Sequence, residues 1–154
     1  MTADSLMAAA LRLLAVRDRT TVELAERLRQ RGFAEEAIAT ALERCRDFGY
    51  LDDAHFARER ARILRRDGRA VGEKAVHDLR LRGVPEELAR AAVAEASGAA
   101  TEGEVLRSLL ERHFPDFCFA AADDRQRRRV VHYFLRRGFP LSGVMNILHG
   151  REDD

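Results

Sequence analysis

The stretch Leu28-Arg29-Gln30-Arg31-Gly32-Phe33-Ala34-Glu35 recurs in two further copies along this chain of 154 residues. The later copies are Leu79-Arg80-Leu81-Arg82-Gly83-Val84-Pro85-Glu86 and Phe134-Leu135-Arg136-Arg137-Gly138-Phe139-Pro140-Leu141. Each copy has a bulky apolar residue four positions before its glycine, an arginine directly before it and an apolar residue directly after it. This pattern predicts a helix that stops at a left-handed glycine, a tight turn, and a second helix that packs back on the first.

The spacing of these three turns indicates a repeated unit. Gly32 and Gly83 lie 51 residues apart, and Gly83 and Gly138 lie 55 residues apart. Periods of this length are typical of tandem helical arrays rather than of one closed globule. We therefore predict an all-α fold of three tandem three-helix repeats, which cover residues 1–50, 51–98 and 99–154.

Other local signals agree with a wholly helical chain. Thr20 with Glu23 and Thr101 with Glu104 fit capping boxes, and Asp52 is placed as a helix N-cap. No alternating β-branched run of the kind that forms strands is present. The apolar stripes predict nine helices in three triplets. Four residues expected on inward helix faces are Phe48, Phe56, Ile63 and Leu64.

Composition and charge restrict the class of protein. Hydrophobic residues make up 46% of the chain and charged residues 34%, so small cores with a highly charged exterior are expected. The net charge is only +1, and no global field attracts nucleic acid. The basic residues are 26 arginines and the single Lys74. This bias is typical of a genome rich in G and C, and it also supplies planar donors for carboxylates and phosphates.

The sequence predicts a soluble, cytoplasmic protein. Cys45 and Cys118 form no C-x-x-C motif and are interpreted as reduced thiols. No secretion leader, no run of 18 apolar residues and no lipidation motif is present, so no membrane association is expected.

Catalysis finds no support in the sequence. The five histidines lack H-E-x-x-H spacing, and neither a phosphate-binding loop nor a G-x-S-x-G motif is present. Asp52 and Asp53 resemble a carboxylate pair, but capping of the following helix explains them. We therefore predict that the chain is not an enzyme and has no catalytic residue, metal site or cofactor.

Segregated positive charge is the more informative feature. The stretch from Arg58 to Arg82 contains nine basic and four acidic residues, and the stretch from Arg125 to Arg137 contains six arginines and no acid. These cations form either a solvated surface or a binding surface for acidic protein, nucleic acid or a complex of both. Tyr50 and Tyr133 are the exposed aromatic candidates for stacking on bases, although Tyr50 could instead pack at the first junction. The candidate partner-binding residues are Arg58, Arg62, Arg65, Arg66, Arg69, Lys74, Arg80, Arg125, Arg128, Arg129 and Arg136.

Two ordered features together carry a resemblance to a known family. The segment Leu51-Asp52-Asp53-Ala54-His55-Phe56-Ala57 is followed by arginines and Gly68, and the arginine–glycine turns occur in triplicate. In these features the chain resembles the RecX family, bacterial regulators of the recombinase RecA, over residues 6–150. The departures are a basic set almost without lysine and a third unit lengthened around residues 114–124.

The resemblance implies an elongated, curved molecule that binds RecA filaments on DNA and lowers filament growth. RecA ATP hydrolysis, strand exchange and co-protease activity would fall as a consequence in recombinational repair and the SOS response. It implies no cofactor and no catalytic residue, and we expect a monomer. An alternative is a helical nucleic-acid-binding module that acts directly on single- or double-stranded DNA, for which RecA binding is secondary.

Overall fold

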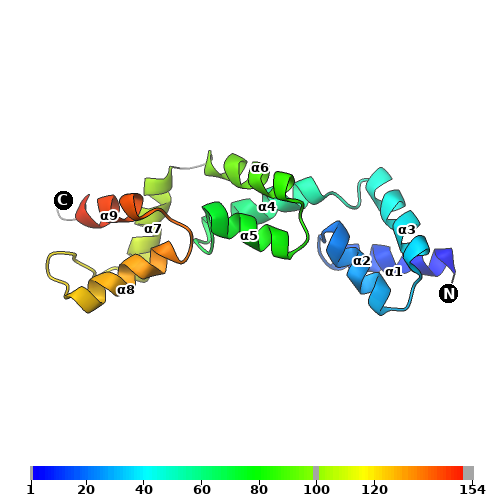
Figure 1. Ribbon diagram of the computed structural model, residues 1–154, viewed down its shortest axis with the longest axis horizontal. Coiled ribbons are helices and arrows are strands. Elements are labelled where there is room, and N and C mark those ends of the chain that lie inside the picture. The colour runs from blue at the N-terminus through cyan, green and yellow to red at the C-terminus, as the bar shows by residue number, and fades with distance from the viewer. Residues whose placement is uncertain (1, 99–100, 151–154) are drawn as a thin grey trace.

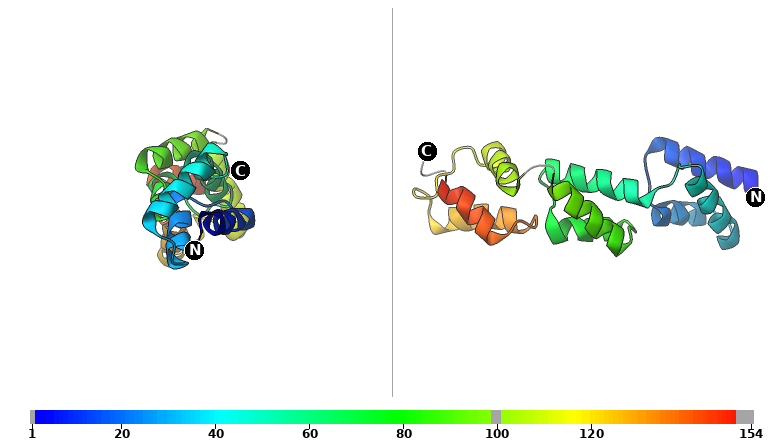
Figure 2. Two further views of the ribbon diagram at one scale, coloured as in Figure 1. Left: turned by 90° about the vertical axis from the view of Figure 1, so that its right-hand side faces the viewer. Right: turned by 90° about the horizontal axis from the view of Figure 1, so that it is seen from above.

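The computed structural model describes residues 2–98 and 101–150, and in these ranges the chain is entirely helical apart from its turns and loops. Three triplets of helices follow one another in an elongated, curved array, and the view from above shows the same order (Figures 1 and 2). The described helices are α1 (Ala3–Val16), α2 (Thr21–Gln30), α3 (Glu35–Asp47), α4 (Asp53–Arg66), α5 (Gly72–Leu81), α6 (Glu86–Ser97), α7 (Glu102–His113), α8 (Asp124–Leu135) and α9 (Leu141–Gly150). The predicted all-α repeat fold is confirmed.

The arginine–glycine turns have the predicted geometry. Gly32, Gly83 and Gly138 adopt φ values of 89°, 94° and 99°, which an L side chain rarely adopts. In each turn, the amide after the glycine donates to the carbonyl five residues earlier, as in a Schellman motif. These hydrogen bonds join Phe33 to Leu28 at 3.4 Å, Val84 to Leu79 at 3.0 Å and Phe139 to Phe134 at 3.3 Å.

Helix starts also follow local sequence signals. The capping boxes at Thr20 and Thr101 are both formed, and Asp52 accepts the His55 amide at 3.0 Å. A third capping box, which the sequence reasoning did not identify, starts α8 with Asp123 and Gln126. Each box satisfies backbone N–H groups that the first helical turn leaves without partners.

Each triplet has its own buried core. In the first, Leu24 and Leu28 are among the fully buried residues, and in the third the same is true of Phe134 and Phe139. The second triplet buries small residues, mainly Ala57, Ala61, Ala75, Ala89 and Ala92. Small cores in series are what a tandem array requires, because each unit packs mainly on itself and its neighbours.

The limits 1–50, 51–98 and 99–154 stay predictions. Leu51 is buried with the first core and Val71 with the third, so packing extends across those limits. Residues 1, 99–100 and 151–154, on which the outer limits depend, lie outside the described part of the chain.

One residue expected to face inward is exposed, and the expected inward face of α4 is correct only in part. Phe48 is 62% exposed and stands at the C-cap of α3, directly after the helix ends at Asp47. On α4 the buried side chains are Ala57, Ala61 and Leu64, whereas Phe56 and Ile63 are only half-buried. The alanines leave room for α6 to lie close to α4, and Phe56 packs against the core that they form.

The arginine–glycine turns also join neighbouring triplets. At the first junction, the carbonyl of Arg82 accepts the hydroxyl of Thr20 at 2.6 Å. At the second, the carbonyl of Arg137 accepts the amide of Val71 at 2.8 Å. Thr20 is the N-cap of α2, so the end of α5 meets the start of α2 at the first junction. Val71 is the N-cap of α5, so the end of α8 meets the start of α5 at the second junction (Figure 1).

Asp53 adds a second bond at the first junction. Its carboxylate accepts the Thr21 amide at 2.7 Å, so Asp53 caps the start of α2 across the junction. The sequence reasoning assigned Asp53 only to its own helix. Among the described residues, no helix is both long and apolar enough to cross a lipid bilayer.

Candidate interaction surfaces

The predicted cations of the second triplet are largely paired with neighbouring acids. Arg62 lies 2.9 Å from Glu59, and Asp67 lies 3.1 Å from Arg66 and 3.8 Å from Arg69. The hydrogen bond from Arg62, together with its charge, lowers the pKa of the Glu59 carboxyl. The residues of this set that α4 and the following turn expose are Arg58, Arg62, Arg66 and Arg69.

Three other predicted cations of this triplet have different surroundings. Arg65 was expected to point outward but is half-buried at the end of α4, between two surface hollows. Lys74 is exposed, and its Cγ lies 3.2 Å from the position that a Cβ on Gly138 would occupy, so it sits at the second junction. Arg80 is exposed and lies 3.8 Å from Glu86.

The predicted cations of α8 are arranged differently. All four are exposed, and none forms an ion pair within 4.0 Å with an acid in the described part of the chain. The four residues are Arg125, Arg128, Arg129 and Arg136. The structure therefore separates an α4 surface whose positive charge Glu59 and Asp67 compensate in part from an α8 surface whose arginines have no acid within 4.0 Å among the described residues.

An aromatic surface of the first triplet combines Tyr50, which the sequence offered as an exposed aromatic candidate, with Phe48, which was expected to face inward. Phe48 is 62% and Tyr50 57% exposed, and their ring centroids lie 6.0 Å apart. With Met7 and Leu11 of α1 they border a hollow of about 420 Å³, which Asp4 and Arg44 also line, and we call Phe48, Tyr50, Met7 and Leu11 the aromatic patch. The local sequence does not reveal the exposure of Phe48, because Phe48 follows the buried Cys45 at helical spacing.

Tyr133 is not the exposed aromatic residue that was expected. Its ring packs edge-on against Phe114 and Phe134, with centroids 5.0 and 5.2 Å away, and the guanidinium of Arg137 lies 3.5 Å from its centroid. A ring held in this way belongs to the core of the third triplet. Tyr50, by contrast, remains accessible.

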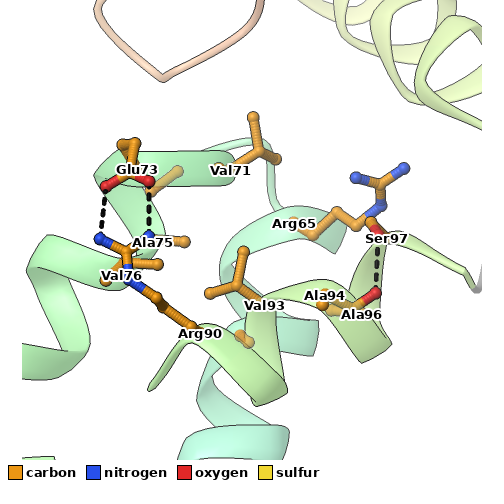
Figure 3. Close-up of a pocket in the computed structure, with 13 residues that line it drawn as sticks. Arg65, Val71, Glu73, Ala75, Val76, Arg90, Val93, Ala94, Ala96 and Ser97 are labelled. Atoms are coloured by element: carbon orange, nitrogen blue, oxygen red, sulfur yellow. Dashed lines mark hydrogen bonds and ion pairs between the residues drawn. The ribbon is translucent and has the colours of Figure 1, made fainter. Parts of the chain in front are cut away.

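A hollow of about 360 Å³ lies between α4, α5 and α6 (Figure 3). Its lining is mainly alanine and valine, with an ion pair of 2.7 Å between Arg90 and Glu73. The Ser97 hydroxyl donates to the Ala94 carbonyl at 2.6 Å, and no histidine or cysteine lines the hollow. These residues can hold an apolar group, but they do not place a nucleophile beside a base.

Residues suited to metal binding are dispersed. No group of three His, Cys, Asp or Glu side chains that could hold a metal ion occurs in residues 2–98 and 101–150. Both cysteines are free thiols; Cys45 is buried, which raises its pKa, and Cys118 is exposed.

Comparisons with known proteins agree on one family. A family model described as the first three-helix domain of RecX matches residues 7–45. A protein named Regulatory protein RecX from Syntrophotalea carbinolica is 47% identical over 130 residues, which cover 84% of this chain and 85% of the relative. A protein of the same name from Trichlorobacter lovleyi is 40% identical over 131 residues, 85% of each chain.

Solved structures share the fold. The crystal structure of RecX from Lactobacillus salivarius superposes with a TM-score of 0.82 at 18% identity and covers 99% of this chain and 97% of that one. A second crystal structure, of a regulatory protein RecX, has a TM-score of 0.77 at 21% identity and covers 99% of this chain and 73% of the other.

Proposed function

This chain belongs to the RecX family of regulatory proteins, and from that premise we propose that it binds RecA filaments assembled on DNA and lowers their activities. Filament extension, ATP hydrolysis, strand exchange and co-protease activity of RecA would all fall. The role belongs to recombinational DNA repair and the SOS response in the cytoplasm.

The elongated array is the observation that supports this proposal most directly (Figure 1). A long body can contact more than one subunit of a helical polymer, so several weak contacts add through their effective concentration. The regulator can shift the equilibrium between two conformations of the filament only by the difference between its affinities for them. Inhibition therefore needs no bond-making group in the regulator.

The aromatic patch is the best candidate for a protein contact. Exposed aromatic side chains dominate the energetics of protein interfaces, and charged residues are depleted at interface centres. Phe48 and Tyr50 supply two large side chains next to a hollow that a partner's side chain can fill. We assign this patch, and separately the exposed α4 arginines, to contacts with the RecA filament.

The test measures RecA ATP hydrolysis on single-stranded DNA with this protein at substoichiometric amounts. We expect inhibition well below one copy per RecA, because one bound regulator affects the growth of a whole filament. Inhibition that requires an excess over DNA sites would indicate competition for DNA and contradict the proposal.

A matched pair of variants locates the contact. Phe48→Ser with Tyr50→Ser is expected to weaken inhibition at least tenfold, the loss typical of interface anchors at about 1.4 kcal/mol or more. Val16→Ser with Leu81→Ser is the control, since these side chains are 78% and 75% exposed outside the patch. Equal inhibition by both folded variants would exclude the aromatic patch from the RecA contact.

A further inference from the structure

We propose that a hollow at the second junction binds a small fatty-acid-like anion, which has one carboxylate head and one apolar tail. The hollow measures about 440 Å³ and lies between the last turns of α4 and α6 and the first two turns of α7. We call it the junction hollow. The inference goes beyond the proposed function, because such a ligand is neither RecA nor DNA.

One side of the junction hollow is apolar. Ala96 of α6 lines it together with Val105 and Leu109 of α7. Leu109 also packs on the turn after α4, where it fills the space that a side chain on Gly68 would need. Helices of two triplets therefore meet around one apolar surface, and an alkyl tail placed on that surface is removed from water.

The other side is cationic and is formed by the last turn of α4. Arg62, Arg65 and Arg66 line it, and their spacing of three and four residues places them on one side of the helix. Arg62 donates to Glu59 through Nη2 at 2.9 Å, and Arg66 donates to Asp67 through Nε at 3.1 Å. A guanidinium carries several N–H donors in a planar fork, so these bonds use only part of each group and a carboxylate can bind the rest.

The acids near the hollow compensate this charge only in part. Asp67 is shared, since it lies 3.1 Å from Arg66 and 3.8 Å from Arg69. Among the described residues that line the hollow, the one acid is Glu104, whose carboxylate accepts the Thr101 amide at 3.4 Å. A single negative charge suits this lining better than a dianionic phosphate, which Glu104 would repel more strongly.

Size and surroundings favour a small molecule over a protein partner. Small-molecule sites in proteins enclose about 300–1,000 Å³, and the junction hollow falls in this range. A protein interface of standard size needs about 800 Å² from each partner, with large side chains near its centre. The large exposed apolar side chains of the described residues, for example Phe48 and Leu81, do not line this hollow.

A ligand in the junction hollow contacts both sides of the second junction. Helices α4 and α6 belong to the second triplet, and α7 belongs to the third. A ligand that binds the joined arrangement stabilises it by mass action. The hydrogen bond from the Val71 amide to the Arg137 carbonyl, at 2.8 Å, reports on this junction, because it forms only when the two triplets are joined.

The test uses the full chain without RecA or DNA, and octanoate is the probe. Isothermal titration calorimetry should show saturable binding at one site per chain. Octanamide has the same tail without the charge, and butyrate has the same head with a shorter tail, so each should bind at least tenfold more weakly. Hydrogen exchange at the Val71 amide should slow as octanoate is added and should not respond to equal concentrations of butyrate.

A pair of charge variants tests the cationic side. Arg62→Gln with Arg66→Gln should weaken octanoate binding at least tenfold, because the carboxylate loses two charged donors. Arg12→Gln with Arg46→Gln removes the same charge from exposed positions of the first triplet and should leave the affinity unchanged.

A pair of volume variants tests the apolar side. Ser108 is exposed on α7 and lines the hollow, so Ser108→Trp should fill it and abolish octanoate binding. Ala39 is exposed on α3, and Ala39→Trp is the control that adds the same ring outside the hollow. Circular dichroism checks that all variants keep the helical content of the natural protein.

Three results would overturn the proposal. They are the absence of saturable octanoate binding, equal affinity for octanoate and octanamide, and equal octanoate affinity in the Ser108→Trp and Ala39→Trp variants. Octanoate binding by a chain that fails to inhibit RecA would contradict the proposed function and leave the ligand site intact.

Discussion

Asp78 of α5 illustrates how single residues hold helices together inside one triplet. Its carboxylate accepts hydrogen bonds from Arg60 Nε of α4 at 3.0 Å and from Arg82 Nε at 3.3 Å. Burial alone would raise the pKa of Asp78, but hydrogen bonding and charge from Arg60, followed by Arg82, outweigh it and lower the pKa. Since the side chains of Asp78 and Arg60 are 27% and 21% exposed, solvent screens this pair only in part.

The Asp78 pair predicts a pH-dependent contribution to stability. A lowered folded-state pKa means that the contribution is present above the unfolded value of about 3.9 and is lost as the pH falls through the folded value. Asp78→Asn should therefore lower the free energy of unfolding by about 1–3 kcal/mol at pH 7, and the difference from the natural protein should shrink below about pH 4. Urea titrations at pH 7 and below pH 4 measure both values.

Glu43→Gln is the control for Asp78→Asn, because Glu43 is exposed on α3 and forms no ion pair within the described residues. It should change the free energy of unfolding by less than about 0.5 kcal/mol at either pH. An Asp78→Asn effect of the same size at both pH values would show that packing, and not charge, is responsible.

The helical elements and their turns could be predicted because their signals are local. Gly83 directly after Arg82, and Thr20 three residues before Glu23, each specify one helix end through contacts within a few residues. The bond from Thr20 to Arg82 could not be predicted, since it joins residues 62 apart and adds no periodic signal. For the same reason the arginines could be located in sequence, but their ion-pair partners could not.

A side chain at Gly138 should destabilise the protein more than a side chain at a turn glycine that contacts no other unit. A Cβ at Gly138 would lie 2.2 Å from the backbone oxygen of Val71, so Gly138→Ala must displace the second junction. At Gly49, with φ of 77°, a Cβ would meet nothing within 4 Å, and Gly49→Ala has only the backbone cost of about 1–2 kcal/mol. Gly138→Ala should destabilise the protein more, and hydrogen exchange at the Val71 amide should accelerate only in that variant. Equal costs and equal exchange would contradict the junction described here.

At the scale of the whole molecule, the array depends on a few bonds between triplets. The first junction is joined by the Thr20–Arg82 and Thr21–Asp53 hydrogen bonds and by Val22 packed against Gly83. Repeat proteins unfold together only as far as their interfaces couple neighbouring units. The candidate surfaces lie on different triplets, with the aromatic patch on the first and the exposed α8 arginines on the third. Their relative placement therefore depends on these junctions, which the sequence pattern does not encode.

Substitution of two threonine N-caps, Thr20 and Thr101, distinguishes the effect of helix capping from the effect of coupling between triplets. Thr20→Ala and Thr101→Ala each remove a capping box and should each cost about 0.5–2 kcal/mol. Only Thr20 also donates to a carbonyl of the next triplet, so only Thr20→Ala weakens a junction. The denaturant m-value scales with the surface area that becomes exposed in one unfolding step. Thr20→Ala should therefore lower the urea m-value and broaden the unfolding transition. Thr101→Ala should shift only the midpoint of the transition. Identical m-values in the two variants would mean that the Thr20–Arg82 bond does not couple the unfolding of the first two triplets.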